Sequence, residues 1–259
     1  MKGEGNIKKI LKSVIILISV VLIWFIAAQY TNPIFIPSPV KVFNNLIEAI
    51  LNGQLWIAFW YSFRRIAIAS KLAAVIAIPI GLLIYNFKFA KDYLYPIVSV
   101  MRYMPVTAFY PLLIMWFGID ETMKVVFLFI ATFVYMMPSV MLALDEVSED
   151  LIDTGLTLGM NKLQTITMIQ LPATLPSICN SFVMCLGISF TYICVAETVN
   201  AKYGLGWIIQ QSSSRGRTDM VFMGIIVIVF MSVILDATLN KIIKTKFKWR
   251  YLEEERGNK

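Results

Sequence analysis

Residues 145–172 read DEVSEDLIDTGLTLGMNKLQTITMIQLP, a polar stretch between two apolar runs. The runs cover about residues 123–144 and 174–196 and carry a single charged residue between them. Each is about as long as the roughly 20 apolar residues that a helix needs to cross a bilayer. The polar stretch is therefore expected to connect two membrane-spanning helices on one side of a membrane.

The polar stretch has the pattern of a short amphipathic helix. Glu149, Asp153 and Thr157 follow one another at intervals of four residues, and leucines and isoleucines form a second line. Residues at this spacing lie on one face of a helix. We expect Gly159 to end this helix in a left-handed cap and Pro172 to open the next helix in its first turn.

The charge of this segment indicates what its helix binds. Five carboxylates and one lysine occupy residues 145–162, so the surface of an anionic bilayer would repel the segment. A groove on a partner protein is the favoured binding site.

The rest of the chain has the composition of a polytopic membrane protein. Of its 259 residues 58% are hydrophobic and only 15% are charged, against about 25% charged residues in soluble domains. Four further apolar runs are long enough to cross a bilayer: 13–28, 66–87, 93–117 and 220–243. The sequence thus predicts an all-α fold with six transmembrane helices.

The spans divide the chain into an N-terminal anchor (1–30), an outer segment with an amphipathic stretch (31–63), a five-helix core (64–245) and a tail (246–259). The first apolar run resembles a signal peptide, but it exceeds the usual 7–15 residues, so an uncleaved anchor is expected. Lys and Arg are twice as frequent in the segments on the side of the N-terminus. Both termini and the 145–172 loop are therefore expected in the cytoplasm.

Several kinds of chemistry are not expected. The chain has no histidine, which excludes histidine-containing metal sites and Ser-His or Cys-His catalysis. Its three cysteines lie in one apolar segment and are expected to be buried, with no disulfide or metal site. No G-x-x-x-x-G-K-[ST] pattern is present, so nucleotide chemistry belongs to another chain. The basic residues lie beside apolar runs, which favours membrane topology over nucleic-acid binding. The protein is not expected to be an enzyme.

The loop resembles the EAA loop of permease subunits in binding-protein-dependent ATP-binding-cassette (ABC) importers. Asp153-Thr154-Gly155, three residues, Gly159, nine residues and Ile169-Gln170-Leu171-Pro172 match that family's spacing, although three other residues replace E-A-A. Further segments also resemble the family, the last two its nitrate/sulfonate/taurine branch: Ile36-Pro37-Ser38-Pro39; Met101-Arg102-Tyr103-Met104-Pro105 running on to Pro111 and Trp116-Phe117-Gly118; and Ala196-Glu197 with Gly204-Leu205-Gly206.

The resemblance implies a type I permease fold in a bacterial inner membrane. The complex would contain two permeases, as a homodimer, two cytoplasmic ATPases that bind ATP and Mg²⁺, and an extracytoplasmic solute-binding protein. The loop would be the coupling helix, with the ATPase contact at Asp153, Leu156, Gly159, Ile169, Leu171 and Pro172. The solute would be a small anion such as a sulfonate, taurine or nitrate. A vitamin precursor is the alternative, and a secondary transporter is disfavoured because the acidic loop would then have no role.

The 93–117 span is the expected lining of the translocation pathway. Pro105 and Pro111 each remove a helix hydrogen bond, and exposed backbone at membrane depth is tolerated beside protein or a water-filled cavity. Tyr103, Thr107 and Tyr110 are the candidates. Arg102 either serves the pathway or extends to the headgroups.

The 174–196 span carries a line of small residues. Ser177, Ser181, Cys185 and Ser189 recur at intervals of four, and Tyr192 continues the face. A packing seam is slightly favoured over a polar pore stripe, with Ser181 and Tyr192 as pathway candidates.

Three acidic residues and one lysine complete the candidates. Glu197 is expected to contact the binding protein, with a salt bridge to an outer arginine or solvation as alternatives. We interpret Glu121 as a solvated loop residue. Lys71 is expected to extend outward, and Asp236 to pair within the bundle.

Overall fold

The computed structural model of the protein describes residues 2–250, with the side chains of α1 described at residues 11, 12 and from 14 onward. Over this range the chain is helical and forms no strand. Here η1 and η2 are 3-10 turns and η3 is a π-helix. The elements are α1 (Lys2–Tyr30), α2 (Pro39–Leu51), α3 (Gln54–Asn86), α4 (Lys88–Val100), η1 (Met101–Tyr103), η2 (Val106–Phe109), α5 (Tyr110–Phe117), α6 (Glu121–Asp145), α7 (Glu149–Thr157), α8 (Lys162–Gln164), η3 (Thr165–Gln170), α9 (Leu171–Ala196), α10 (Leu205–Ser214) and α11 (Thr218–Lys246).

The expected all-α membrane fold is confirmed, but the six spans are not six equal helices. Within the described residues, four helical runs are long and apolar enough to cross a membrane: α3, α6, Lys162–Ala196 and α11. The expected 93–117 span is broken, because Lys88–Tyr103 and Val106–Phe117 meet at 89°. In α1 the apolar part is the shorter helix Val14–Tyr30.

Pro105 explains the break. A residue before proline is driven out of the helical region, and Met104 accordingly has an extended ψ of 125°. Proline also donates no backbone hydrogen bond. The chain therefore leaves α4 through η1, turns at Met104–Pro105 and re-enters a helix at η2.

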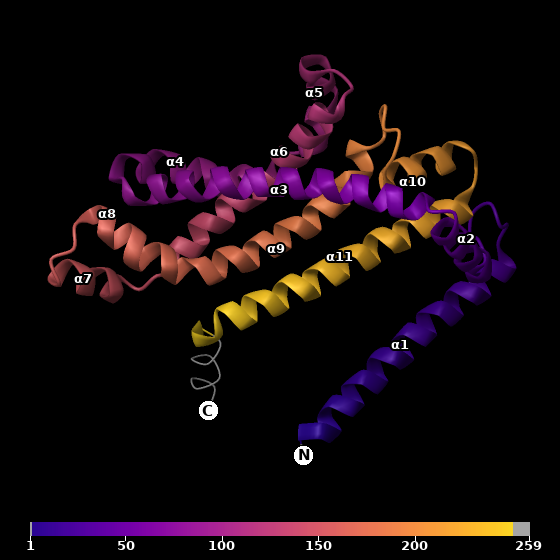
Figure 1. Cartoon of the computed structure of the whole chain (residues 1–259), viewed down its shortest axis with the longest axis horizontal. Helices are drawn as coiled ribbons and strands as arrows, with labels where there is room; N and C mark the ends of the chain where they lie inside the picture. Colours follow the sequence, from indigo (N-terminus) through magenta and orange to yellow (C-terminus); the bar gives the residue numbers. More distant parts are fainter. Residues whose placement is uncertain (1, 251–259) are drawn as a thin grey trace.

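The long helices give the molecule two distinct ends (Figure 1). α7 and α8 lie at one, which we call the loop end, and α2 and α10 lie at the other, which we call the α2–α10 end. α5 projects from the bundle, and α1 runs apart from the other long helices. Residues far apart in the sequence thus gather at each end.

The core of the bundle is packed between α3, α6 and α9. One apolar cluster contains Phe127 and Val134 of α6 and lies toward the α2–α10 end, and a second contains Met137 and Leu144 and lies toward the loop end. Met101 of η1 packs against both clusters. The break between α4 and α5 therefore lies beside the middle of α6.

Hydroxyl groups tie the three core helices together. Ser189 Oγ of α9 lies 2.6 Å from Thr132 Oγ1 of α6 and 3.2 Å from Ser70 Oγ of α3, and all three residues are fully buried. Cys185, one turn before Ser189, is also buried. The small-residue line of α9 is a packing seam at these positions.

The amphipathic stretch expected in the outer segment 31–63 is two helices, α2 and the start of α3. Gly53 turns the chain with φ of 76°, and Asn52 Oδ1 accepts a hydrogen bond from the Gln54 backbone N–H at 3.0 Å. α3 then runs through residues 63 and 64, so the boundary expected there falls inside a helix. Of the expected tail, residues 251–259 lie outside the described part of the chain.

Candidate functional site

The loop end is built around the cap that closes α7. The Gly159 N–H donates to Leu156 O at 3.0 Å, the Met160 N–H donates to Gly155 O at 3.1 Å, and Gly159 has φ of 82°. These two bonds form a Schellman cap, which favours glycine at the left-handed position. Pro172 lies in the first turn of α9. The expected amphipathic helix, its glycine cap and the proline start of the next helix are all confirmed.

The loop then folds back on α7. Asn161 and Gln164 form a capping box, in which each side chain accepts a hydrogen bond from the other's backbone N–H. Thr165–Gln170 follow as a π-helix, a form that is rare in proteins. This brings Ile169 against Gly155, where an added Cβ would overlap Ile169 Cδ1. Glycine at position 155, in place of the alanine of the family pattern, thus gives α7 and η3 close contact.

The loop exposes apolar side chains. Leu156 is 52% exposed and Leu163 is 69% exposed. The others among these exposed apolar residues are Leu151, Leu158 and Met168. Asp153 and Pro172 are also exposed, whereas Ile169 and Leu171 are half-buried. Among the predicted contact residues, Asp153, Leu156 and Pro172 thus lie on the surface, whereas Ile169 packs within the loop.

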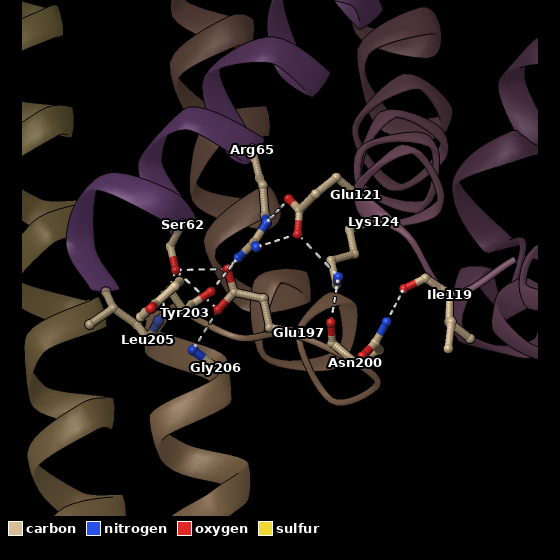
Figure 2. A network of polar contacts seen from close by, with 10 residues as sticks. All are labelled: Ser62, Arg65, Ile119, Glu121, Lys124, Glu197, Asn200, Tyr203, Leu205 and Gly206. Carbon is tan, nitrogen blue, oxygen red and sulfur yellow. Dashed lines mark hydrogen bonds and ion pairs between the residues drawn. The ribbon is translucent and has the colours of Figure 1, made fainter. Parts of the chain in front are cut away.

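The α2–α10 end carries a network of charged side chains centred on the buried Arg65 (Figure 2). Arg65 Nε and Nη2 donate to the two carboxylate oxygens of Glu121 at 2.7 and 2.6 Å. Arg65 Nη1 donates to Glu197 Oε1 at 2.5 Å and to Tyr203 O at 2.8 Å. The Arg65 side chain is 2% exposed and that of Glu197 is fully buried. One guanidinium thereby joins α3, α6 and the segment after α9.

Glu197 has further donors around it. Ser62 Oγ donates to the carboxylate at 2.8 Å, and the Gly206 N–H donates to Oε2 at 2.8 Å. Ser62 Oγ in turn accepts from the Leu205 N–H at 2.8 Å. Burial is the largest influence on the pKa of Glu197 and raises it, while Arg65, Ser62 and the Gly206 N–H act in the opposite direction by stabilising the charged form.

Two glycines make room for this carboxylate. Gly204 has φ of 147°, and a Cβ there would overlap the Glu197 carboxylate. A Cβ on Gly206 would lie 2.9 Å from Cys194 Cα, closer than real side chains pack. The segment Ala196-Glu197 with Gly204-Leu205-Gly206 is therefore one structural unit, in which the glycines form the pocket for the glutamate.

Two sequence-based interpretations are corrected by the network. Glu121 is not a solvated loop residue, because it is bound by Arg65 and by Lys124 Nζ, 3.2 Å away. Glu197 forms the alternative salt bridge, with Arg65, and its buried carboxylate offers no surface to a binding protein. Lys124 is also buried, and its Nζ donates to Asn200 O at 3.1 Å.

The sequence reasoning missed Arg65, Ser62 and Lys124 as members of this network. The sequence contains one signal for the network: the cations Arg65 and Lys124 and the carboxylates Glu121 and Glu197 all lie near ends of predicted spans on the same side of the membrane.

Asp236, expected to pair within the bundle, is exposed, and it accepts a hydrogen bond from Asn240 Nδ2 of its own helix at 2.9 Å.

The pathway candidates form two groups. Arg102 and Tyr103 are exposed on η1, with Tyr103 78% exposed, and Thr107 is exposed on η2. Tyr110 and Tyr192 both pack edge-on against Phe127, with ring centroids 5.1 and 5.9 Å away.

Ser181 joins neither group. It is half-buried on α9 three turns from Tyr192, or about 16 Å along the helix at 1.5 Å per residue.

Comparison with known proteins gives a consistent family. The family described as "binding-protein-dependent transport system inner membrane component" matches residues 73–247. The taurine transport system permease protein TauC of Escherichia coli (strain K12) is 28% identical over 232 residues, 87% of this chain and 84% of that protein. The putative aliphatic sulfonates transport permease protein SsuC of Bacillus subtilis (strain 168) is 29% identical over 215 residues, 83% of this chain and 78% of that protein.

A solved structure supports the same fold. An inward-facing conformation of the MetNI methionine ABC transporter aligns with a TM-score of 0.66 and 22% identity, covering 74% of this chain and 95% of that chain. Members of the matching family are the membrane components of importers that also contain an ATPase and a solute-binding protein. The chain belongs to this family and is the multi-pass permease subunit of a binding-protein-dependent ABC importer, a transport component and not an enzyme.

Proposed function

We propose that this permease works as a homodimer that carries a small anionic solute across the membrane, with both termini and the loop end in the cytoplasm. A separate ATPase docks on the loop end and binds the ATP and Mg²⁺. The solute-binding protein delivers its cargo at the α2–α10 end.

The break between α4 and α5 is the observation that supports the pathway. It lies beside the middle of α6, and it leaves Arg102, Tyr103 and Thr107 exposed in the single chain. Lipid cannot satisfy polar groups and non-helical backbone at this depth. A water-filled passage between two copies of the chain would provide both water and a second protein surface for these groups.

The exposed apolar side chains of the loop support the docking of the ATPase. Large apolar groups that face water on a polar loop mark protein interaction sites. The Schellman cap and the capping box hold the loop in one shape, so a partner meets a preformed surface. The carboxylates of α7 favour a docking groove with basic residues.

An anionic solute is supported by Arg102 and by the names of two relatives, which refer to taurine and to aliphatic sulfonates. A sulfonate that leaves water needs cationic or hydrogen-bonding groups along its route. Arg102 is exposed beside the break, and its Nε is bound only loosely, to Ser99 O at 3.3 Å. A vitamin precursor is the alternative cargo.

Uptake into proteoliposomes that contain the assembled complex tests this proposal. We expect ATP-dependent uptake of taurine or an alkanesulfonate, and a loss of about tenfold or more in Arg102→Met, from the loss of one charge-assisted hydrogen bond. Arg102→Lys should retain part of the uptake. Lys71→Met, which removes an exposed charge from α3, is the control. Uptake that Arg102→Met leaves unchanged, in an assembled complex, would exclude Arg102 from the pathway, and uptake of a cationic solute instead would exclude the anion.

A further inference from the structure

A groove lies between α1, α2 and α11 near the α2–α10 end. Its volume is about 400 Å³, within the range of small-molecule sites in proteins. Every side chain that lines it is apolar. The principal lining residues are Val21 and Trp24 of α1, Val40 and Phe43 of α2, and Met223 and Ile226 of α11.

The walls of this groove are fixed by contacts of Trp24. Its indole Nε1 donates to Pro37 O at 3.1 Å, and its ring stacks on Phe222 of α11 with centroids 5.7 Å apart. With its N–H bonded to a carbonyl, Trp24 contributes no free donor to the groove. An apolar occupant suits such a site, because apolar cavities hold water poorly.

Positive charge gathers one helical turn from the groove. Asp219 precedes the lining residue Met223 by four residues, so both lie on one face of α11. Lys41 Nζ lies 3.3 Å and Arg217 Nη2 3.6 Å from Asp219 Oδ2, and the same atom accepts from Asn45 Nδ2 at 2.9 Å. Two cations therefore share one carboxylate, and the cluster carries a net positive charge.

The two cations are also accessible. The side chains of Lys41 and Arg217 are 63% and 54% exposed, whereas that of Asp219 is 6% exposed. Lys41 lies in α2 between Val40 and Val42, which both line the groove. An apolar slot and a cationic cluster thus occupy neighbouring positions on α2 and α11.

We propose that this site binds one phospholipid with an anionic headgroup. Its acyl chain fills the groove, and its phosphate lies on Lys41 and Arg217, where ammonium and guanidinium groups form charge-assisted hydrogen bonds with phosphate oxygens. A phospholipid is the occupant that combines both chemistries, and the bilayer around these helices supplies it. The lipid would also join α1, which runs apart from the other long helices, to α2 and α11 (Figure 1).

Quenching of Trp24 fluorescence by brominated lipids tests the proposal. In a variant with the other five tryptophans replaced by phenylalanine, Trp24 reports on the acyl chain in the groove. The full-length protein is reconstituted in phosphatidylcholine vesicles that contain either brominated phosphatidylglycerol or brominated phosphatidylcholine. We expect phosphatidylglycerol to be favoured at Trp24 by about fivefold, the effect of roughly one basic residue near an anionic lipid. Lys41→Gln with Arg217→Gln should abolish this preference while quenching itself persists.

Two controls separate the site from the bulk bilayer. A variant that retains only Trp56, 63% exposed on α3 and without a basic residue within one helical turn, should show no preference between the two lipids. Arg64→Gln removes an exposed cation elsewhere in α3 and should leave the preference at Trp24 intact.

Three results would overturn the proposal. The first is equal quenching of Trp24 by the two brominated lipids. The second is a preference that survives in the double variant. The third is quenching that falls as the protein-to-lipid ratio rises, which would show that a second copy of the chain fills the groove.

Discussion

The two ends of the molecule handle apolar and charged side chains in opposite ways. At the loop end, Leu156 and Leu163 are exposed on a polar segment. At the α2–α10 end, Arg65, Lys124 and Glu197 are buried, and each forms hydrogen bonds within this chain. The loop end thus exposes apolar side chains outside the apolar helices, and the α2–α10 end buries charged ones.

The difference shows at which end the side chains find all their partners within one chain. Buried charges are tolerated when they are paired and hydrogen-bonded, and Arg65 and Glu197 have such partners in this chain. Exposed leucines on a polar loop are removed from water only when a partner protein covers them. Changes at the α2–α10 end should therefore affect stability, and changes at the loop end should affect binding.

Arg65→Met should produce the largest effect on stability. It leaves the Glu197 carboxylate buried without its cation, and breaking a buried pair in this way costs about 3–5 kcal/mol. Reversible unfolding in mixed micelles measures the change in the free energy of unfolding. Arg64→Met is the matched control, because the neighbouring arginine is exposed and forms no ion pair in the described part of the chain. Equal losses in the two variants would show that the network contributes nothing specific.

Leu156→Asp combined with Leu163→Asp should weaken the binding of the ATPase at the loop end without a loss of stability. The loss of anchors at an interface costs about 2 kcal/mol or more, so the affinity for the ATPase should fall by about 30-fold or more. The stability of the isolated permease should change little, because both side chains are largely exposed. Co-purification and a binding titration measure the first effect, and unfolding measures the second.

Thr154→Ala is the control on the same helix, since Thr154 is also exposed. ATPase binding at full affinity by the double aspartate variant would exclude these leucines from the contact.

Gly159→Ala should have a smaller effect, through the backbone alone. A Cβ there meets nothing within 4 Å, but φ of 82° is unfavourable for alanine, at a cost of about 1–2 kcal/mol. Gly187→Ala in α9 also meets nothing within 4 Å, and it should gain about 0.5–1 kcal/mol because alanine favours a helix. Gly159→Ala should lower the melting temperature and Gly187→Ala should raise it. A lower melting temperature in both variants would argue against the Schellman cap as the cause.

The sequence predicted the features that depend on local pattern. The acidic amphipathic helix, its end at Gly159 and the start of α9 near Pro172 follow from spacing and from the backbone preferences of glycine and proline. Four of the expected apolar runs lie in single helices that are long and apolar enough to cross a membrane, as their length and hydropathy predict. The extent of the bend at Pro105 did not follow, because the angle depends on how η1 and η2 pack against α6.

The charged network could not be derived from the sequence, because its members are far apart in the chain. Arg65 and Glu197 are separated by 132 positions, and no local pattern indicates that Arg65 lies between Glu197 and Glu121 in space. Their assignment to one side of the membrane was the only available signal. The exposed apolar side chain of Leu156 had a clearer signal, since it follows Ile152 by four residues on α7, whereas Leu163 lies beyond the Gly159 cap in α8.

Maleimide labelling at both ends of the same protein shows which end a bound ATPase covers. In a variant without the three native cysteines, a cysteine at Leu163 reports on the loop end, and a cysteine at Ser213 of α10 reports on the other end. Both positions are exposed and should react in the permease alone. With the ATPase bound, position 163 should be protected and the labelling of position 213 should be unchanged. Protection of position 213 with unchanged labelling of position 163 would contradict this prediction.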